Sequence, residues 1–187
     1  PGKHDQTYGH KSCGDWRGYK GYIYEGGHRE PFIASWPGTI PAGAVSDQLG
    51  GLQDLLATVA DLLGEELPAD AGEDSISLLP ALLGQATGPI RSDLIHHSCN
   101  GTFSIRQGDW KLIVDDDGCG DSGRGFQGAL ASKPDPSARG QLYHLGDDPF
   151  EVYDRITKEP QVAARMRALI DRYRADGRSV ARSLAEP

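Results

Sequence analysis

Residues 17–38 read RGYKGYIYEGGHREPFIASWPG, a glycine- and charge-rich segment that passes into a short apolar run and closes on Pro37-Gly38. The apolar residues 32–36 predict a buried strand. A loop, a buried strand and a turn, in that order, are how an α/β enzyme presents its chemistry at the end of a sheet. Glycines at positions 18, 21, 26 and 27 allow the backbone to take positive φ angles and to approach a ligand closely.

Among these glycines lie several charged or titratable side chains: Lys20, Glu25, His28 and Arg29. A cation on a glycine-rich loop suits an anionic ligand such as sulfate or phosphate. From the residue alone, Lys20 is explained equally well as an anion ligand and as an ordinary solvated lysine. The pattern around Lys20 therefore has to decide between the two interpretations.

That pattern, K-G-x-x-x-E-G-G-x-R-x-P-F-I-x-x-W-P-G from Lys20 onward, resembles a segment of the type I sulfatases. These are formylglycine-dependent sulfuric ester hydrolases of the alkaline phosphatase superfamily. In the family, the segment follows a metal-binding Asp-Asn pair and its lysine contacts the sulfate. The resemblance therefore implies that Lys20 is a catalytic residue and also binds the substrate.

Two more phrases resemble the small C-terminal subdomain of sulfatases: IRxGDWKLI at 105–113 and QLYxLxxDPxE at 141–151. We interpret them as structural signatures rather than as chemistry. The resemblance covers nearly all of this chain but only the C-terminal part of a sulfatase. We therefore expect the chain to be a fragment of a longer enzyme.

The family's cofactors are not expected in this fragment. Sulfatases carry their nucleophile in a Cys/Ser-x-Pro-x-Arg motif, and the surroundings of Cys13, Cys99 and Cys119 do not fit it. The resemblance implies that the formylglycine and the aspartates that bind Ca²⁺ lie upstream of Pro1. We expect no metal site in the fragment, and we expect the fragment alone to be inactive.

The composition of the chain argues against several classes of binding partner. A formal net charge of −8 argues against nonspecific nucleic-acid binding, which needs a basic face. No apolar run approaches the length of a membrane-spanning helix, which is about 18 residues or more. The three cysteines show no metal-like spacing; their odd number leaves at least one free thiol, and unpaired cysteines are the favoured interpretation. The resemblance implies a periplasmic or secreted protein, although the sequence itself does not fix the compartment.

The expected fold class is α/β to α+β, in two parts. Residues 1–84 would be the tail of the large sulfatase α/β domain, with a helix at 54–63 whose aliphatic stripe is core and whose N-cap is Asp54. A helical turn is expected at 77–83. Residues 90–187 would be a small antiparallel-sheet subdomain with a C-terminal helix.

Short apolar runs in the second part predict a four-stranded meander, and Asn100-Gly101 marks its first hairpin turn. The strands are expected at 93–98, 103–106, 110–114 and 141–145. The loop at 115–140 is expected to be the least ordered internal segment. Its acidic start could hold a cation, but a solvated loop is favoured. A helix at 161–175 should cover one face of the sheet with the stripe Val162, Met166, Leu169, Ile170 and Tyr173.

His96 and His97 are the second candidate site. Adjacent strand residues point to opposite faces, so one histidine should face the core and the other should face outward. One interpretation makes them a buried and an exposed structural histidine. The other makes one of them a substrate-binding residue at the rim of the active site, and the sequence does not say which.

The function predicted from these residues is that of a sulfatase fragment, which contributes a sulfate-binding lysine and the rim of the substrate cleft. Its expected partners are a sulfated small molecule or glycan and the missing N-terminal sulfatase domain. Two alternatives stay open: a non-catalytic carbohydrate-binding or interaction module, and a phosphoryl hydrolase of the same superfamily. The identity of the substrate cannot be read from the chain.

Overall fold

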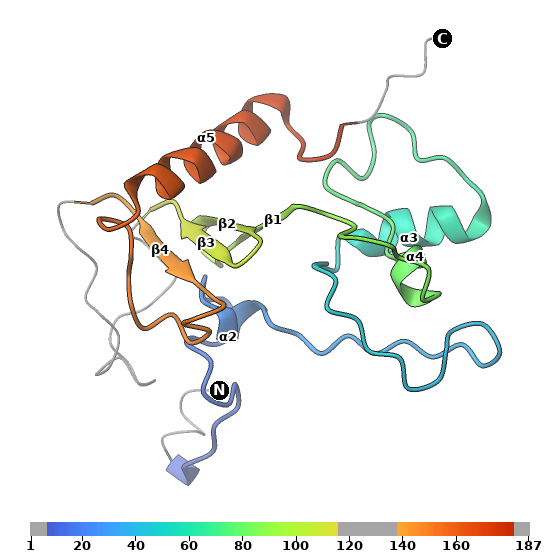
Figure 1. Cartoon of the computed structure of the whole chain (residues 1–187), viewed down its shortest axis with the longest axis horizontal. Helices are drawn as coiled ribbons and strands as arrows, with labels where there is room; N and C mark the ends of the chain where they lie inside the picture. Colours follow the sequence, from blue (N-terminus) through green and yellow to red (C-terminus); the bar gives the residue numbers. More distant parts are fainter. Residues whose placement is uncertain (1–6, 116–137, 182–187) are drawn as a thin grey trace. The chain divides into compact units, whose positions relative to one another are not determined.

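The structure is a computed structural model that describes residues 7–115 and 138–181 (Figure 1). In chain order its elements are α2 (Glu25–His28), α3 (Asp54–Leu63), α4 (Leu79–Leu82), β1 (Asp93–His97), β2 (Phe103–Gln107), β3 (Trp110–Ile113), β4 (Gln141–His144) and α5 (Pro160–Asp176). The chain forms two compact units. Unit 1 comprises Pro1–Glu30 and Ile95–Ile170, and unit 2 comprises Pro31–Leu94 and Asp171–Pro187. The boundary predicted at residues 84–90 concerns the domains of a longer protein and stays a prediction.

The sheet confirms the predicted meander. Its strand order is β1-β2-β3-β4, and both β2–β3 and β3–β4 are antiparallel. The pairs Ile105↔Leu112 and Lys111↔Tyr143 set the register. Gly101 and Gly108 have positive φ angles of 85° and 58° in the tight turns before β2 and β3, a conformation that glycine adopts without a steric penalty.

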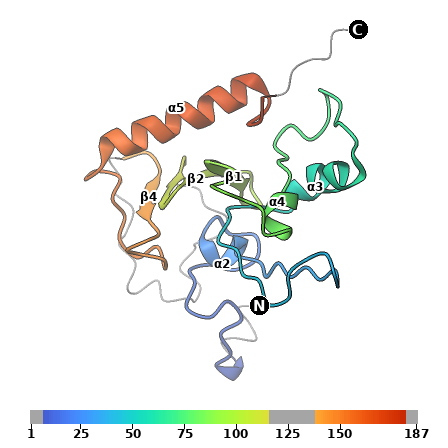
Figure 2. The same ribbon diagram turned by 45° about the vertical axis from the view of Figure 1, so that its right-hand side comes forward.

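The alternation of side chains gives the sheet two different faces. Ile105, Leu112 and Leu142 lie at paired positions, so they share one face, and all three are fully buried. On the other face, Ile113, Tyr143 and Leu145 form a buried cluster with Ile23 and Tyr24 from the segment that leads into α2. Figures 1 and 2 show α5 on one side of the sheet and α2 on the other.

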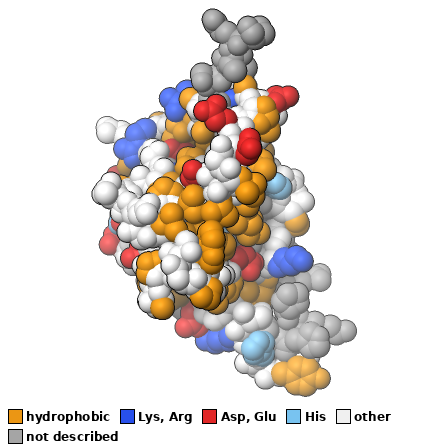
Figure 3. Space-filling view, turned by 90° about the vertical axis from the view of Figure 1, so that its right-hand side faces the viewer, with side chains coloured by type: hydrophobic (Ala, Val, Ile, Leu, Met, Phe, Trp, Pro, Cys, Tyr) orange, Lys and Arg blue, Asp and Glu red, His pale blue; other side chains and the backbone are white. Residues whose placement is uncertain are grey.

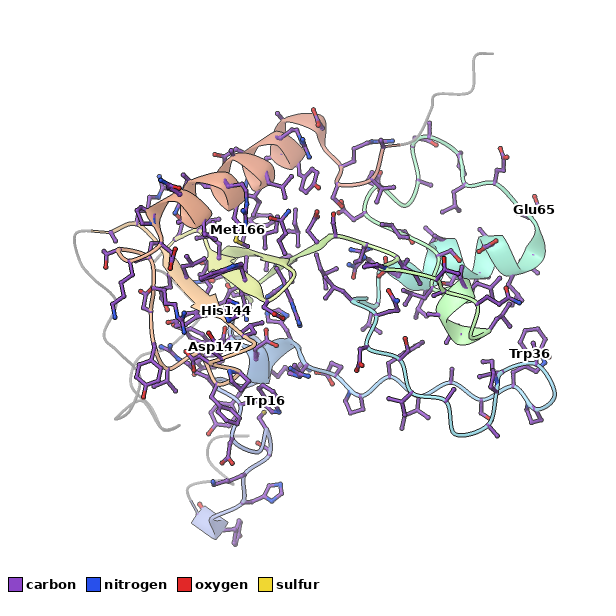
Figure 4. All side chains as sticks on the ribbon, in the orientation of Figure 1. Trp16, Trp36, Glu65, His144, Asp147 and Met166 are labelled. Carbon is purple, nitrogen blue, oxygen red and sulfur yellow. The ribbon has the colours of Figure 1, made fainter. Side chains whose placement is uncertain are left out.

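Helix α5 confirms the predicted C-terminal helix, extended by one residue at each end. Its buried residues are Ala163, Met166 and Ile170, which recur at the helical period, and Figure 4 labels Met166 between α5 and the sheet. Arg167 of the same helix donates to the carbonyl oxygen of Val114 at 2.9 Å and thereby links α5 to the end of β3.

Two predictions of burial in unit 2 are wrong. Residues 32–36 form no strand, and their side chains are exposed, Ile33 to 90%. A strand is stabilised by hydrogen bonds to neighbouring strands, and within the described residues none pairs with this segment. Helix α3 forms as predicted, with Gly64 in the left-handed conformation at its end, but its aliphatic stripe is not core. The exposed stripe consists of Leu55, Leu56, Val59, Leu62 and Leu63.

Unit 2 therefore presents a broad apolar surface, which we call the apolar face. Its residues are the α3 stripe, and Phe32, Ile33 and Trp36 of the same unit are exposed as well. Figure 3 looks onto this part of the chain and shows hydrophobic side chains over much of it. Single exposed apolar residues are ordinary, whereas a contiguous patch of this kind marks a surface that contacts something else.

The sequence predicted Asp54 as the N-cap of α3, and this prediction is wrong. Gln53 occupies that position, and Asp54 is the first residue of the helix. Its carboxylate is fully buried and accepts hydrogen bonds from the backbone of Gly51 at 2.8 Å and of Ile76 at 2.9 Å. It also forms an ion pair with the buried guanidinium of Arg91. The distant partner Arg91 draws the carboxylate inward, so Asp54 ties together three segments of unit 2.

The cysteines also differ from the favoured interpretation, because Cys99 is disulfide-bonded while Cys13 is a free thiol. Helix α4 confirms the helical turn predicted at 77–83. Most of the 115–140 loop, residues 116–137, lies outside the described residues. In the part of the chain that the structure describes, no helix is both long and apolar enough to cross a membrane.

Candidate active-site loop

The segment from Arg17 to Arg29 folds into a tight loop that ends in the short helix α2. Gly18 and Gly21 take positive φ angles of 83° and 94°, as predicted. Gly26 and Gly27 do not take positive φ angles. These two glycines are needed for close packing: a Cβ on Gly27 would lie 2.3 Å from the carbonyl oxygen of Tyr22. The backbone of α2 therefore passes directly against the loop that carries Lys20.

A buried ionic cluster holds this loop on the sheet. The ammonium of Lys111 lies 2.9 Å from Glu25 and 2.8 Å from Glu151, and all three side chains are almost completely buried. The backbone N–H of Glu25 also donates to the carboxylate of Glu151 at 2.6 Å. The three residues come from three separate phrases of the sequence: the Glu-Gly-Gly turn, strand β3 and the Asp-Pro-x-Glu turn. We call them the Lys111 cluster.

Arg17 adds a second layer of buried polar contacts. Its guanidinium lies 3.7 Å from the centroid of the Tyr24 ring. It donates to the hydroxyls of Tyr143 at 2.9 Å and Tyr24 at 3.0 Å, and to the carbonyl oxygen of Glu151 at 2.9 Å. Both tyrosine hydroxyls in turn donate to the side-chain oxygen of Gln141. These bonds satisfy polar groups that would otherwise be costly to bury.

The electrostatics of the cluster separate its two carboxylates. Burial opposes ionisation of Glu25, but the charge and hydrogen bond of Lys111 outweigh it, so the pKa of Glu25 is lowered. For Glu151, deeper burial dominates and the neighbouring Glu25 charge adds to it, so its pKa is raised. Burial also raises the pKa of Tyr143 well above its ordinary value. Lys111 thus outweighs the effect of burial on the ionised form of Glu25, but it does not outweigh that effect for Glu151.

Lys20 lies at the exposed tip of the loop. The residue after it, Gly21, is fixed to the far end of β1, because its carbonyl oxygen accepts from the backbone N–H of Cys99 at 2.8 Å. A Cβ on Gly21 would lie 3.4 Å from the Cβ of Cys99. The structure therefore brings the Lys20 loop next to the turn that follows His96 and His97.

His96 and His97 lie in different environments, as the alternation of strand residues predicted. The ring of His96 packs on that of His28, with centroids 4.1 Å apart, and the Nε2 atoms of both rings are buried without a hydrogen-bond partner. His97 is exposed; its Nδ1 lies 2.9 Å from the carbonyl oxygen of Ser98, and its ring lies 5.8 Å from that of Phe103.

The buried histidine pair is uncharged near neutral pH. Burial, helped by the positive charge of Lys111, lowers the pKa of His28 to about 4. The same two causes lower the pKa of His96 well below its ordinary value. The backbone of Tyr22 and of Ile23, hydrogen-bonded to His28 and His96 respectively, works in the opposite direction but does not prevail. The pair therefore packs as two neutral rings beneath the loop.

Sequence reasoning missed the Lys111 cluster and the role of His28. The phrases that contain Lys111 and Glu151 were noted, but no spacing rule joins residues so far apart in the chain. A lysine flanked by Trp110 and Leu112 within a strand was the available signal, since a charged residue at a buried position requires a partner.

Within residues 7–115 and 138–181, no group of three or more His, Cys, Asp or Glu side chains is arranged to hold a metal ion. The described residues therefore do not offer the oxygen-rich ligand set that Ca²⁺ prefers. What this site does offer is an exposed cation on a loop that is anchored rigidly from below.

Comparison with known proteins finds sulfatases. The chain is 37% identical to the N-acetylgalactosamine-6-sulfatase of Sus scrofa over 141 residues, which is 70% of this chain and 27% of that protein. It is 30% identical to the N-acetylgalactosamine-6-O-sulfatase of Bacteroides thetaiotaomicron over 174 residues, 91% of this chain and 33% of that protein. It is also 36% identical over 143 residues to human arylsulfatase A, with 73% of this chain and 28% of that protein covered.

Solved structures agree. A Bacteroides thetaiotaomicron sulfatase from work on the metabolism of multiple glycosaminoglycans superposes with a TM-score of 0.72 at 28% identity, over 91% of this chain and 34% of that one. The PsFucS1 sulfatase of Pseudoalteromonas sp. gives 0.61 at 27% identity, over 85% of this chain and 33% of that one. No family model matches the chain. The chain thus spans about a third or less of the length of these relatives.

Proposed function

Because this chain belongs to the type I sulfatase family and corresponds to the C-terminal part of its members, we propose that the protein of which it forms part hydrolyses a sulfate ester. The observation that carries the proposal is similarity to an N-acetylgalactosamine-6-O-sulfatase along 91% of the chain, including the loop of Lys20. The curated relatives act on sulfate esters by name, so a sulfated small molecule or glycan is the proposed substrate class.

Lys20 is the proposed sulfate ligand and catalytic residue of this chain. Its exposed ammonium can neutralise a sulfate oxygen in the ground state and in the transition state. The Lys111 cluster, the glycine contacts and the bond from Cys99 to Gly21 hold the loop before the substrate arrives. Such preorganisation supports a catalytic role, because the loop loses little further entropy on binding.

His97 and His96 are proposed to form part of the rim of the cleft. The exposed ring of His97 is available to hydrogen-bond a substrate group, whereas His96 contributes by packing on His28 behind it. Cys99, two residues after His97, contacts the carbonyl oxygen of Gly21, and this supports a position close to Lys20.

The family's formylglycine and Ca²⁺ are proposed to reside in the part of the protein outside this chain. Formylglycine would supply the nucleophile, and Ca²⁺ would offset the charge of the sulfate oxygens. Among the described residues no group of three or more His, Cys, Asp or Glu side chains is arranged to hold a metal ion, so the proposed role of this chain rests on Lys20 and the cleft rim.

The apolar face of unit 2 is the proposed contact with the N-terminal part of the sulfatase. The matched region is 27% of one relative and 34% of another, so a large portion of protein is available to cover it. Residues 32–36 would then gain strand partners from the larger sheet.

The disulfide at Cys99 supports a secreted or periplasmic protein, because disulfides persist in oxidising compartments.

The test is Lys20→Ala in the full-length protein, assayed with an aryl sulfate. Loss of one preorganised charge contact is expected to lower kcat/KM by about 100- to 1000-fold. Lys158→Ala, an exposed lysine outside the loop, is the matched control and should retain wild-type kinetics. Near-normal kcat/KM of the Lys20 variant would refute its assignment. Turnover of an aryl phosphate in place of the sulfate would refute the sulfatase function itself.

A further inference from the structure

Trp16, Arg29 and Phe150 form an aromatic and cationic cluster at the surface of unit 1, which we call the Trp16 platform. The guanidinium of Arg29 lies 4.0 Å from the centroid of the Trp16 ring. The rings of Trp16 and Phe150 have centroids 5.3 Å apart and planes tilted by 50°. Phe150 is 40% exposed and the side chain of Arg29 is 49% exposed, so the platform leaves both apolar and cationic surface open. Figure 4 labels Trp16, which lies on the segment that leads into α2.

Each member of the platform is attached to the buried polar layer below it. Trp16 precedes the buried Arg17, and Phe150 precedes the buried Glu151. Arg29 follows Glu25 by one helical turn and pairs with its carboxylate at 3.6 Å. Because these anchors are fixed by the Lys111 cluster and by Arg17, the platform is held in place without a ligand. A preorganised surface loses less conformational entropy when it binds.

The backbone at Glu151 is unusual. Among the described residues it is the one non-glycine with a positive φ angle, 56°. Such a conformation is unfavourable and persists where the surroundings over-determine it, often at ligand sites. Here Lys111 and the backbone N–H of Glu25 hold the carboxylate of Glu151. Phe150, the residue before this turn, lies beside Trp16 and is 40% exposed.

The chemistry of the platform suits a sugar ring with an anionic substituent. The C–H groups of a pyranose can pack on the exposed ring of Phe150 and on the open part of the half-buried Trp16 ring, since aromatic rings have an electron-rich face. The guanidinium of Arg29 can donate two parallel hydrogen bonds to a sulfate or carboxylate group. The neighbouring Glu25 offsets part of its charge, so Arg29 suits one such group and not a dense polyanion.

We propose that the Trp16 platform is a subsite for a second sugar of a sulfated oligosaccharide, next to the sugar whose ester Lys20 binds. The inference rests on the proposed function, and it deepens it by selecting an oligosaccharide as the substrate. Trp16 precedes Lys20 by four positions in unit 1, and this closeness along the chain is what motivates placing the second sugar at the platform.

The test compares two substrates of the full-length protein: a tetrasaccharide that carries N-acetylgalactosamine 6-sulfate, and an aryl sulfate too small to reach the platform. The measured quantity is the ratio of kcat/KM for the tetrasaccharide to kcat/KM for the aryl sulfate. Trp16→Ala is expected to lower this ratio about tenfold, mostly through KM. Trp16→Phe, which keeps an aromatic face, should restore most of it. The control is Tyr8→Ala, because Tyr8 is exposed and, like Trp16, precedes the loop in the sequence. This variant should leave the ratio unchanged.

The outcomes separate the two proposals. If the wild-type enzyme hydrolyses both substrates and Trp16→Ala leaves their ratio unchanged, the subsite is overturned while the sulfatase function stands. If Trp16→Ala lowers Tm and the ratio stays unchanged, the platform is a contact with the rest of the protein, and the subsite is again overturned. If the wild-type enzyme hydrolyses neither, the proposed function fails. In that event calorimetric binding of the tetrasaccharide decides the subsite, which requires an about tenfold weaker affinity for Trp16→Ala.

Discussion

Lys111 of β3 and Glu25 of α2 form an ion pair of 2.9 Å across a separation of 86 residues, with both side chains out of contact with water. The pair ties the sheet of unit 1 to the helix that ends the Lys20 loop. Desolvation of charges is costly, and it is offset in part by the second ion pair of Lys111 with Glu151 and by the hydrogen bond from the backbone N–H of Glu25 to Glu151.

Replacement of Lys111 by Met should therefore destabilise unit 1 strongly. The variant leaves Glu25 and Glu151 buried side by side without their cation. Loss of one partner of a buried ion pair typically costs about 3–5 kcal/mol. Urea denaturation of the chain, followed by near-UV circular dichroism, measures the effect.

The matched control is Arg155→Met, which removes a surface pair of 3.2 Å with the exposed Asp147. Exposed pairs contribute about 1 kcal/mol or less. An equal loss of stability in the two variants would contradict the importance of the Lys111 cluster.

The pair His28 and His96 should make stability depend on pH. The pKa of His28 is lowered to about 4 and that of His96 well below its ordinary 6.5, so below pH 6.5 the unfolded chain binds protons that the folded chain does not. The free energy of unfolding should therefore decline as the pH falls from 6.5 towards 4. Denaturation curves recorded through this range measure it.

Glu151 has the opposite effect on the pH dependence of stability. Because its pKa is raised, Glu151 binds a proton in the folded chain at pH values above 4.5, where the unfolded chain has lost it. Comparison with His28→Gln isolates the histidine contribution, since the variant keeps Glu151 and loses one titrating ring. Its stability should decline less steeply below pH 6.5. Parallel curves for wild type and variant would show that His28 is not buried as neutral imidazole.

Gly27→Ala should disturb the Lys20 loop, because the added Cβ would lie 2.3 Å from the carbonyl oxygen of Tyr22 and 2.7 Å from that of Tyr19. Backbone atoms cannot yield as a flexible side chain can. Such overpacking typically costs about 1–3 kcal/mol. Gly88→Ala, where a Cβ meets nothing within 4 Å, is the control, and its Tm should match wild type. Identical Tm values for all three proteins would disprove the close approach.

Val59→Asp tests the apolar face. Val59 is 51% exposed in this chain, so the substitution should change the stability of the chain by about 0.5 kcal/mol or less. In the full-length protein the same position is proposed to be covered, and a buried unpaired charge would cost several kcal/mol. Thermal unfolding of both forms measures the difference. A small effect in the full-length protein would show that something other than the N-terminal part covers the face, or that nothing does.

The secondary structure was largely predictable because its signals are local. The Asn100-Gly101 turn, the strand runs and the helix α5 each depend on residues within a few positions of one another, and all three are confirmed. The predicted stripe of α5 is confirmed in part: Met166 and Ile170 are buried, whereas Val162, Leu169 and Tyr173 are only half-buried. The strand at 32–36 and the buried stripe of α3 were predicted wrongly for one reason. Their apolar patterns indicate burial, but they do not say whether the covering surface lies within the same chain.

By itself the sequence determined the family, the four strands of the sheet, the helices α3, α4 and α5, and the candidate Lys20, since each follows from a contiguous pattern. Only the tertiary structure decided that Lys111, Glu25 and Glu151 meet, that His96 packs on His28, and that Arg91 holds Asp54. A buried charge needs a partner, but the sequence does not say which distant residue of opposite charge that partner is. Chain folding selects the partner, because only one arrangement also buries the apolar side chains and satisfies the backbone hydrogen bonds.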